Sequence, residues 1–138
     1  MRFAEIKTSK YTQNDLEHKF DPSRNPLVEF QTKIQFKILE EQKRLGCLIV
    51  VIINILETKE KFAELKVENL FEINPFYEVV IKKEENKFEV SDSVMMQLAT
   101  SSVSTVRGIL HEKLKGTIAQ NEVYPLIDVS KFNKENQE

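Results

Sequence analysis

The chain has 138 residues, 41% of them hydrophobic and 30% charged, which is the composition of a globular protein and excludes a disordered one. Its 20 basic and 22 acidic side chains give a formal net charge of -2, without the basic excess that is typical of nucleic-acid-binding domains. The single cysteine, Cys47, excludes an intrachain disulfide and a multi-cysteine zinc site. We expect residues 1–138 to form one domain that ends in a disordered tail of about six residues.

The sequence also bears on the compartment. The N-terminal residues MRFAEIKTSK lack the apolar stretch of a secretion signal. The longest apolar run, Cys47–Leu56, is interrupted by Asn54 and is shorter than the ~20 residues of a membrane-spanning helix. These features predict a cytoplasmic protein that does not insert into membranes.

The first elements follow from apolar and polar alternation. Residues 2–8 alternate loosely and predict a strand, and the polar stretch 9–26, which contains two prolines, predicts a loop. Over 28–38 the alternation is regular and predicts a strand with one buried and one solvated face. The residues on its buried side are Val28, Phe30, Thr32, Ile34, Phe36 and Ile38.

Two further strands complete a meander. Lys43–Gly46 predicts a turn in which Gly46 takes a positive φ. The run CLIVVIINIL that follows is apolar on both parities, which is typical of a strand buried on both faces. After a second turn near Lys59 and Glu60, FAELKVENLFEI alternates again, so three consecutive antiparallel strands are expected.

The second half of the chain predicts one long helix. Residues 76–90 are compatible with a short hairpin around Glu85 and Asn86 or with a crossover loop. Ser91 to Ser93 offer N-cap oxygens, and the helix is expected over 94–115, with Gly116 as the left-handed residue after it.

The segment ATSSVSTVRGILHEKLKGT, residues 99–117, allows two interpretations. A phosphate-binding loop needs glycines before its lysine, and here the order is Lys-Gly-Thr without a preceding GxxxxGK. A helix explains more, because apolar residues recur at helical spacing in two stripes. The stripes are Met95, Leu98, Ala99, Ser102, Val106 and Ile109, and Met96, Val103, Leu110 and Leu114.

A helix with two apolar stripes needs a packing surface on each of two sides. One sheet covers one side, so we expect a second layer, most simply another copy of the chain, with Met95, Ala99, Ser102 and Val106 at the oligomer interface. The alternative is a half-exposed helix whose small residues meet water.

Chemistry-bearing residues are few. His18 lies in the N-terminal loop, His111 lies on the last turns of the helix, and Cys47 starts a buried strand where a thiol behaves as a small hydrophobe. We therefore expect no catalytic residue, no metal site and no cofactor. The carboxylates Glu64, Glu68 and Glu72 form either a solvated face or an acidic docking surface.

The remaining candidate is an apolar groove. One helix covers only one face of the run 47–56, so the other face must be covered by residues 75–90, by residues 125–132 or by a partner. We predict that an unfolded polypeptide binds between the outer face of the strands and these segments. The predicted substrate-binding residues are Phe36, Ile38, Leu48, Val50, Ile52, Phe76, Tyr77, Tyr124, Leu126 and Phe132.

In the order of these pieces the chain resembles the SecB-type export chaperones, from about Phe3 to Phe132. FAELKVENLFEI is similar to the family's fourth strand, STVRGIL lies where the family's helix carries a matching arginine (Arg107), and PLIDVSKF resembles its proline-containing segment. Departures are Glu68-Asn69 in place of paired glycines and Gly108 in place of a glutamate after the arginine.

The resemblance implies an α+β fold, a four-stranded antiparallel sheet with one long helix packed on one face. It also implies a homotetramer built as a dimer of dimers and an ATP-independent holdase for protein export or, as in some relatives, for an antitoxin. It places Phe62 and Glu64 at the surface that docks the SecA motor. The prediction is therefore a chaperone and not an enzyme; the alternative is an intracellular carrier or sensor that holds a small apolar ligand between sheet and helix.

Overall fold

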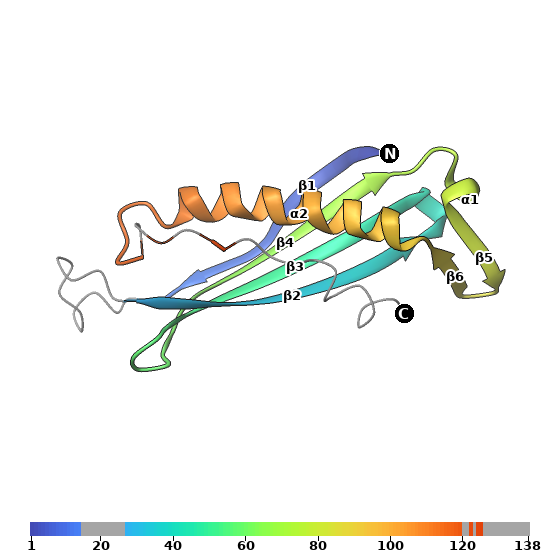
Figure 1. The fold of residues 1–138 in the computed structure, drawn as a ribbon. Coiled ribbons are helices and arrows are strands. Elements are labelled where there is room, and N and C mark those ends of the chain that lie inside the picture. The colour runs from blue at the N-terminus through green and yellow to red at the C-terminus, as the bar shows by residue number, and fades with distance from the viewer. Residues whose placement is uncertain (15–26, 120–121, 123, 126–138) are drawn as a thin grey trace.

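The structure, a computed structural model, describes residues 1–14, 27–119, 122, 124 and 125. Its main body is a four-stranded antiparallel sheet with one long helix, α2, lying along one face and a small hairpin at one end (Figure 1). This confirms the predicted fold class. The elements are β1 (Arg2–Gln13), β2 (Val28–Leu39), β3 (Arg44–Ile55), β4 (Lys61–Glu72), α1 (Phe76–Val79), β5 (Val80–Glu84), β6 (Lys87–Val90) and α2 (Asp92–Lys113).

The strand order in the large sheet is β1-β4-β3-β2, so β1 and β2 are its edges. The meander β2-β3-β4 is the one that the sequence predicted. β1 joins it by pairing with β4, and it runs to Gln13, five residues beyond the predicted strand. The predicted loop is shorter as a result, because residues 9–13 pair with β4 in spite of their polarity.

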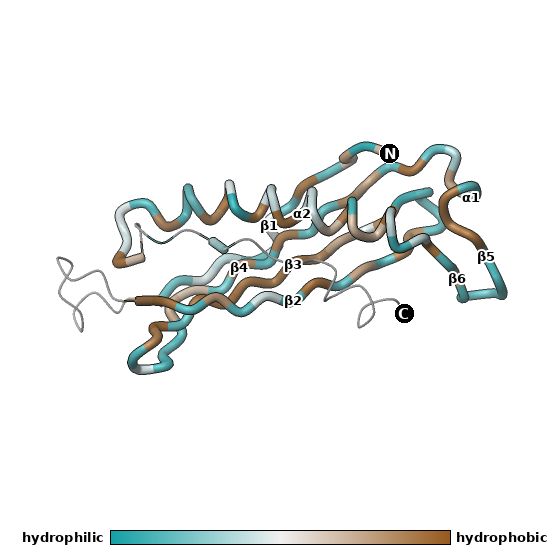
Figure 2. The backbone as a smooth tube through the Cα atoms, viewed as in Figure 1, coloured by the Kyte–Doolittle hydropathy of each residue, from teal (hydrophilic) through white to brown (hydrophobic). Residues whose placement is uncertain are grey.

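The two faces of the sheet differ in burial. Along β3 the odd-numbered residues from Leu45 to Ile55 face α2 and are at most 2% exposed. The even-numbered residues Leu48, Val50 and Ile52 point to the other face and are half-buried. β3 is therefore apolar at nearly every position, and the backbone tube is largely in the hydrophobic colours along this strand (Figure 2).

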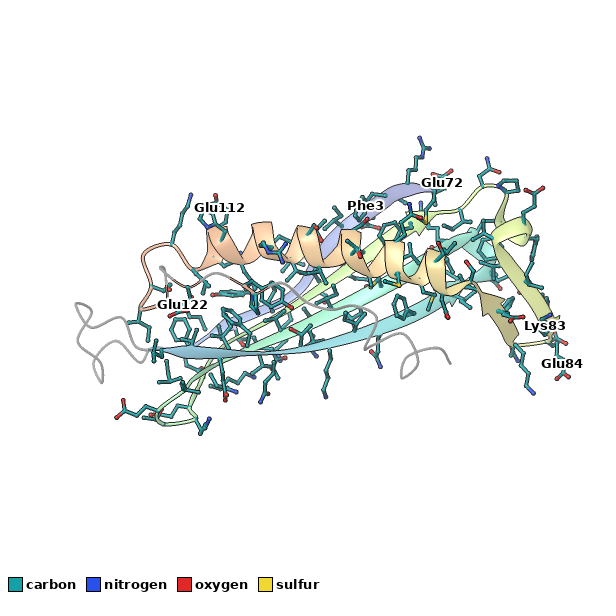
Figure 3. All side chains as sticks on the ribbon, viewed as in Figure 1. Phe3, Glu72, Lys83, Glu84, Glu112 and Glu122 are labelled. Atoms are coloured by element: carbon teal, nitrogen blue, oxygen red, sulfur yellow. The ribbon has the colours of Figure 1, made fainter. Side chains whose placement is uncertain are left out.

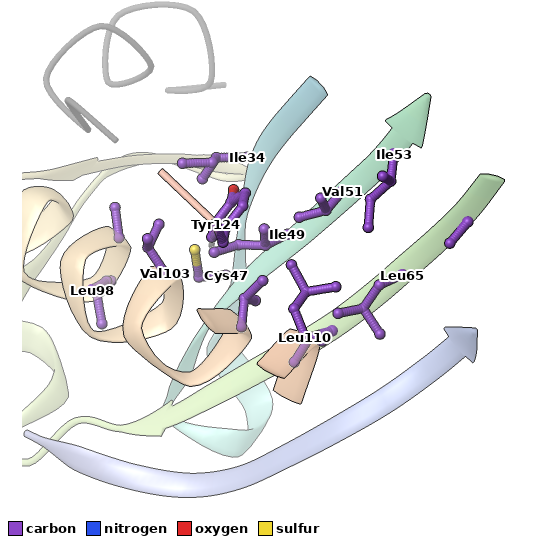
Figure 4. Close-up of a cluster of buried hydrophobic side chains, with 14 of the residues drawn as sticks. Ile34, Cys47, Ile49, Val51, Ile53, Leu65, Leu98, Val103, Leu110 and Tyr124 are labelled. Carbon is purple, nitrogen blue, oxygen red and sulfur yellow. The ribbon is translucent and has the colours of Figure 1, made fainter. Parts of the chain in front are cut away.

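The helix packs with one broad face. At about 100° per residue, the two predicted stripes adjoin and form one arc of about 160°. The side chains of Leu98, Val103 and Leu110 meet Cys47 and Leu65 of the sheet in a single cluster (Figure 4). The inference that the helix is buried on two sides is wrong for the single chain, since both stripes, apart from the exposed Met96, lie on the side of its own sheet.

A small polar group lies inside this apolar layer. The Asn69 side-chain amide donates to the Cys47 carbonyl (3.2 Å) and accepts from the Thr105 hydroxyl (2.8 Å), so the helix is fixed to β4 and β3 by hydrogen bonds. Ser102 Oγ is buried without a hydrogen-bond partner among the described residues. Burial raises the pKa of the neighbouring Cys47 thiol to about 11, which the Ser102 hydroxyl partly opposes.

One predicted turn is placed differently. The chain reverses at Glu40–Gln42, where Lys43 takes the positive φ (55°). Gly46 is instead an extended residue of β3, where an added Cβ would lie 3.3 Å from Leu70. A close approach between strands, and not a turn, therefore explains this glycine.

The predicted helix signals are confirmed. Ser91 is the N-cap, and its hydroxyl accepts from the Val94 amide (3.3 Å). Gly116 takes a φ of 76° after the helix. Residues 76–90 form the single turn α1 and then the hairpin β5–β6, with Asn86 at a φ of 67°. None of the described helices is long and apolar enough to span a membrane.

Candidate functional site

The sheet edge β2 and the helix α2 border a long apolar seam. The even-numbered residues of β2 from Phe30 to Ile38 point to the helix side, because they lie opposite odd-numbered core residues of β3. The hairpin β5–β6 closes one end of this seam, and Tyr124 lies at the other end. We call this region the β2–α2 seam.

The hairpin end holds an apolar pocket of about 90 Å³. Its floor comes from the end of β2 and the start of β3, one wall comes from β6, and the other comes from the first two turns of α2. The lining residues are Phe36, Lys37, Ile38, Leu45, Gly46, Phe88, Glu89, Val90, Met95 and Leu98. Among them, Phe88 and Val90 are half-buried and belong to a hairpin whose other residues, apart from the buried Val80, are exposed. We call this cavity the hairpin pocket.

The hairpin is held in place by the aromatic turn before it. Phe76 is buried, and the Tyr77 hydroxyl accepts from Lys43 Nζ (2.7 Å) and donates to the Glu40 carboxylate (2.8 Å). Lys82 of β5 also lies 3.4 Å from Glu40. The hydrogen bond from Tyr77 and the nearby Lys82 lower the pKa of Glu40. The β2–β3 turn thus fixes the start of the hairpin.

Beyond this anchor, the hairpin has few supports. Lys83 and Glu84 lie at its tip, pointing away from the sheet (Figure 3). The remaining ion pairs of the hairpin, Lys83–Glu89 (3.2 Å) and Lys87–Glu84 (3.5 Å), are internal to it and exposed. A wall held at one end and solvated at the other can move more easily than the sheet.

Tyr124 covers the other end of the seam. Its ring packs on Phe30 in an edge-to-face arrangement (5.4 Å between centroids), and its hydroxyl lies 2.5 Å from the Thr32 hydroxyl. Burial raises the pKa of Tyr124. Arg107 donates to the carbonyls of Tyr124 (3.4 Å) and Pro125 (3.2 Å), which holds this segment against α2.

A second hollow lies between this segment and the last turns of α2. It has a volume of about 400 Å³, and the polar side chains of Arg107, His111 and Glu122 are among its lining residues. Leu110 and Leu114 form its base. The seam is therefore hollowed at both of its ends.

The structure divides the predicted substrate-binding residues. Phe36 and Ile38 line the hairpin pocket, and Tyr124 covers the other end of the seam. Phe76 and Tyr77 lie at the β2–β3 turn. The remaining described members are Leu48, Val50 and Ile52. They lie on the opposite face of the sheet, because they alternate with the core residues of β3.

The cover that the sequence predicted for the outer face thus lies on the helix side, where the hairpin and Tyr124 border the seam. Leu126 and Phe132, together with His18 and the predicted terminal tail, lie outside the described residues. Sequence reasoning missed Phe88, Val90 and Leu98 as pocket residues. The alternation in KFEV after a turn-forming Asn86 was the available signal for the first two.

The predicted docking pair Phe62 and Glu64 is not open to a partner in this chain. Phe62 is fully buried in the core. The Glu64 carboxylate is surrounded by Lys61, Lys10 (3.1 Å) and Lys66 (3.9 Å). Hydrogen bonds from Lys61 and Lys10 hold the pKa of Glu64 at about 2, although partial burial acts in the opposite direction.

The four predicted interface residues lie in the core. Met95, Ala99, Ser102 and Val106 are between 0% and 6% exposed, because they face the sheet of their own chain. Little of their surface is left for another copy. An oligomer would have to use other residues.

The two described candidates for chemistry, Cys47 and His111, lie in different environments, one buried and one exposed. A buried thiol with a pKa near 11 is protonated at neutral pH, so Cys47 is a poor nucleophile. His111 is exposed on the last turn of α2. Within the ranges that the structure describes, no three histidine, cysteine or acidic side chains gather as a metal site would require.

Comparison with known proteins indicates the fold. No family model matches the chain, and no curated protein matches it. A solved structure of a Mycobacterium tuberculosis SecB-like chaperone, in complex with a ChAD peptide from the HigA1 antitoxin, is similar over 91% of this chain and 83% of that chain, with a TM-score of 0.54 and 10% identity. A Streptococcus agalactiae protein of unknown function matches over 91% of this chain and 94% of that chain, with 14% identity and a low TM-score of 0.34. The chain therefore has a SecB-like fold, a distant resemblance.

Proposed function

We propose that this chain is a SecB-like holdase, which binds non-native polypeptide in the β2–α2 seam without ATP and without a catalytic step. The observation that carries the proposal is the hairpin pocket, where Phe36, Ile38 and Phe88 surround a cavity beside the hairpin β5–β6. At about 90 Å³ the pocket takes one large apolar side chain, whereas pockets for whole small molecules typically measure roughly 300–1,000 Å³. A succession of side chains along an extended client fits such a seam.

The proposed clients are unfolded chains, in protein export or in the protection of an antitoxin. The fold supports this, since a SecB-like chaperone of the same fold binds an antitoxin peptide. Docking to SecA through Phe62 and Glu64 is not part of the proposal, because one side chain is buried and the other is surrounded by lysines.

The test is suppression of aggregation of a chemically denatured client by the wild type and by two hairpin variants. Phe88→Ser removes a wall of the pocket, and we expect it to lose most of the suppression. Ile81→Ser is the matched control, because Ile81 is 42% exposed on the same hairpin and does not line the pocket. Equal activity of both variants would place binding elsewhere, and a wild type that suppresses nothing would refute the holdase.

A carrier of a small apolar ligand is the second candidate. The hollow beside Leu110, Leu114 and Tyr124 favours it, because about 400 Å³ is within the range of ligand pockets. Native mass spectrometry distinguishes the two functions. A stoichiometric small molecule on the purified protein would support the carrier, and peptide adducts alone would support the holdase.

We also propose a homotetramer, built as a dimer of dimers of the 16.1 kDa chain. Its contacts must come from exposed apolar side chains, of which Phe3, Ile6 and Met96 are 38%, 45% and 39% exposed. Light scattering at micromolar concentration tests this: a mass of one chain would refute it.

A further inference from the structure

The free edge of β2 has a regular hydrogen-bonding pattern that can be read from its neighbours. The Leu56 amide donates to the Leu27 carbonyl (2.9 Å), so odd-numbered residues of this strand exchange hydrogen bonds with β3. The Ile73 amide donates to the Lys43 carbonyl (3.2 Å), so odd-numbered residues of β3 exchange hydrogen bonds with β4. The even-numbered residues of β3 are then the ones that bond to β2, in agreement with the Leu56–Leu27 contact. The N–H and C=O groups of the even-numbered residues of β2 therefore point away from the sheet, to its edge.

These even-numbered residues are also the ones whose side chains border the seam. Phe36 and Ile38 line the hairpin pocket, and Ile34 and Thr32 continue the row toward Tyr124. Among the described residues, no strand pairs with this edge. Backbone donors and acceptors and apolar side chains are thus offered on the same residues, along the same line.

The register makes the edge usable over its length. β2 pairs with β3 without an interruption from Val28 to Leu39, so its outward groups keep a constant spacing. The opposite edge, β1, has two irregularities, after Phe3 and after Thr8. Broken register and bulges are common protections of an edge, and β2 lacks them.

We propose that a client segment binds by adding an antiparallel strand to β2, so that its backbone pairs with the even-numbered residues and alternate side chains enter the seam. This rests on the proposed function and specifies how the same site binds. Residues directly opposite each other share a face of the sheet, so the client residue opposite Phe36 points into the hairpin pocket.

The charges on the outer face of β2 indicate which side chains the client carries at the positions between its apolar residues. The odd-numbered residues Lys33 and Lys37 point to the outer face, and no described carboxylate forms an ion pair with either of them. Client residues on that parity lie opposite these lysines, where acidic side chains are favoured and basic ones are disfavoured. The occupant is therefore an extended segment with large apolar residues at every second position and acidic residues between them.

A second copy of β2 fits the edge less well. In an antiparallel pair centred on Gln35, Lys33 of one copy would lie opposite Lys37 of the other, and like charges repel. The lysines thus act against self-pairing and in favour of an acidic partner.

The experiment uses a synthetic peptide of about eight residues, alternating Leu or Phe with Glu, and measures its affinity by titration calorimetry. N-methylation of the Leu and Phe amides removes the hydrogen bonds to β2 and should weaken binding by about tenfold or more, since each bond contributes several-fold. N-methylation of the Glu amides, which point to solvent, should have little effect. Equal effects of both sets, or the inverse pattern, would overturn strand addition.

Two further measurements separate this proposal from the holdase itself. The double variant Lys33→Glu/Lys37→Glu should prefer a Leu/Lys peptide over the Leu/Glu peptide, and Lys7→Glu on β1 is the matched control. Residue-resolved amide exchange should show added protection at Thr32, Ile34, Phe36 and Ile38 in the peptide complex.

Amides at these positions that are already protected in the free protein would show that the edge is occupied, and would overturn the proposal. If the peptide binds and Phe88→Ser weakens it while methylation has no parity effect, strand addition fails and the holdase stands. If neither the peptide nor a denatured client binds, both fail.

Discussion

The two edges of the sheet have the same length and are held in different ways. β1 is tied to β4 at the surface by ion pairs, Arg2–Glu72 and Lys10–Glu64, each 3.1 Å long. β2 is covered on its helix side by Tyr124, which packs on Phe30. Beyond the backbone pairing that holds both edges, β1 is thus supported by short surface ion pairs, and β2 is supported by a buried aromatic contact.

The difference extends to what each edge exposes. On β1 the apolar side chains of Phe3 and Ile6 are 38% and 45% exposed, and the register with β4 has two breaks. Figure 3 labels Phe3 and the nearby Glu72, the partner of Arg2. β2 buries its apolar side chains partly in the seam and leaves an unbroken row of backbone groups. The first arrangement suits contact between surfaces, and the second suits an extended chain.

The largest expected effect comes from lifting α2 off the sheet, which would remove the seam but leave the β1–β4 pairing. Val106 is fully buried, so Val106→Glu places an unpaired charge in the core and should lower the free energy of unfolding by several kcal/mol, roughly 3–5. Ser104→Glu, on the exposed side of the same helix, should change it by less than about 0.5 kcal/mol. Urea denaturation of both variants measures this, and similar midpoints would contradict the assignment of the buried face.

A smaller loss of unfolding free energy is expected from removing the ion pairs on the β1 side. Glu64→Gln removes the carboxylate that Lys10, Lys61 and Lys66 share, and should cost about 1–2 kcal/mol at neutral pH after allowance for partly exposed lysines. Glu5→Gln, an exposed change on β1, is the control.

The effect of Glu64 should depend on pH. Its folded pKa of about 2 lies below the ordinary 4.5, so its contribution is complete above pH 4.5 and is lost as the pH falls from 4.5 toward 2. The difference in unfolding free energy between wild type and Glu64→Gln should shrink over that window. A difference that stays constant down to pH 2 would mean that the ion pairs do not form in solution.

The smallest loss of unfolding free energy is expected from removing one hydroxyl on the β2 side. Tyr124→Phe keeps the ring on Phe30 and removes the hydroxyl from Thr32, at a cost of about 1 kcal/mol that does not depend on salt. Tyr11→Phe on β1 is the control, because its hydroxyl donates to the exposed Gln13 side chain (2.7 Å). Thermal unfolding at low and high salt compares the two; equal, salt-dependent losses would remove the distinction between the edges.

Much of the sheet could be predicted from the sequence because its strands alternate strictly. The parity of 28–38 identified the helix-facing side of β2 correctly, and Ser91 and Gly116 marked the ends of the helix region. β1 was foreseen only in part, since residues 9–13 are polar and are held by pairing with β4, a contact that local pattern does not reveal.

The site was harder to predict for a physical reason. The run 47–56 is apolar on both parities, so the sequence could not say which face the aromatic segments cover. The two helical stripes adjoin within one arc of about 160°, so they form one face of the helix and not two. Phe62 departs from the alternation because the β3–β4 register shifts next to it, between Ile53 and Asn54.

The most direct test of the account is site-specific photo-cross-linking to a denatured client. A photoreactive residue replaces Ile38, in the seam, or Val50, at the outer face of the neighbouring strand, and each variant is first shown to fold as the wild type does. The account predicts strong cross-links from position 38 and weak ones from position 50. Cross-links from position 50 that equal or exceed those from position 38 would contradict the placement of the binding site between β2 and α2.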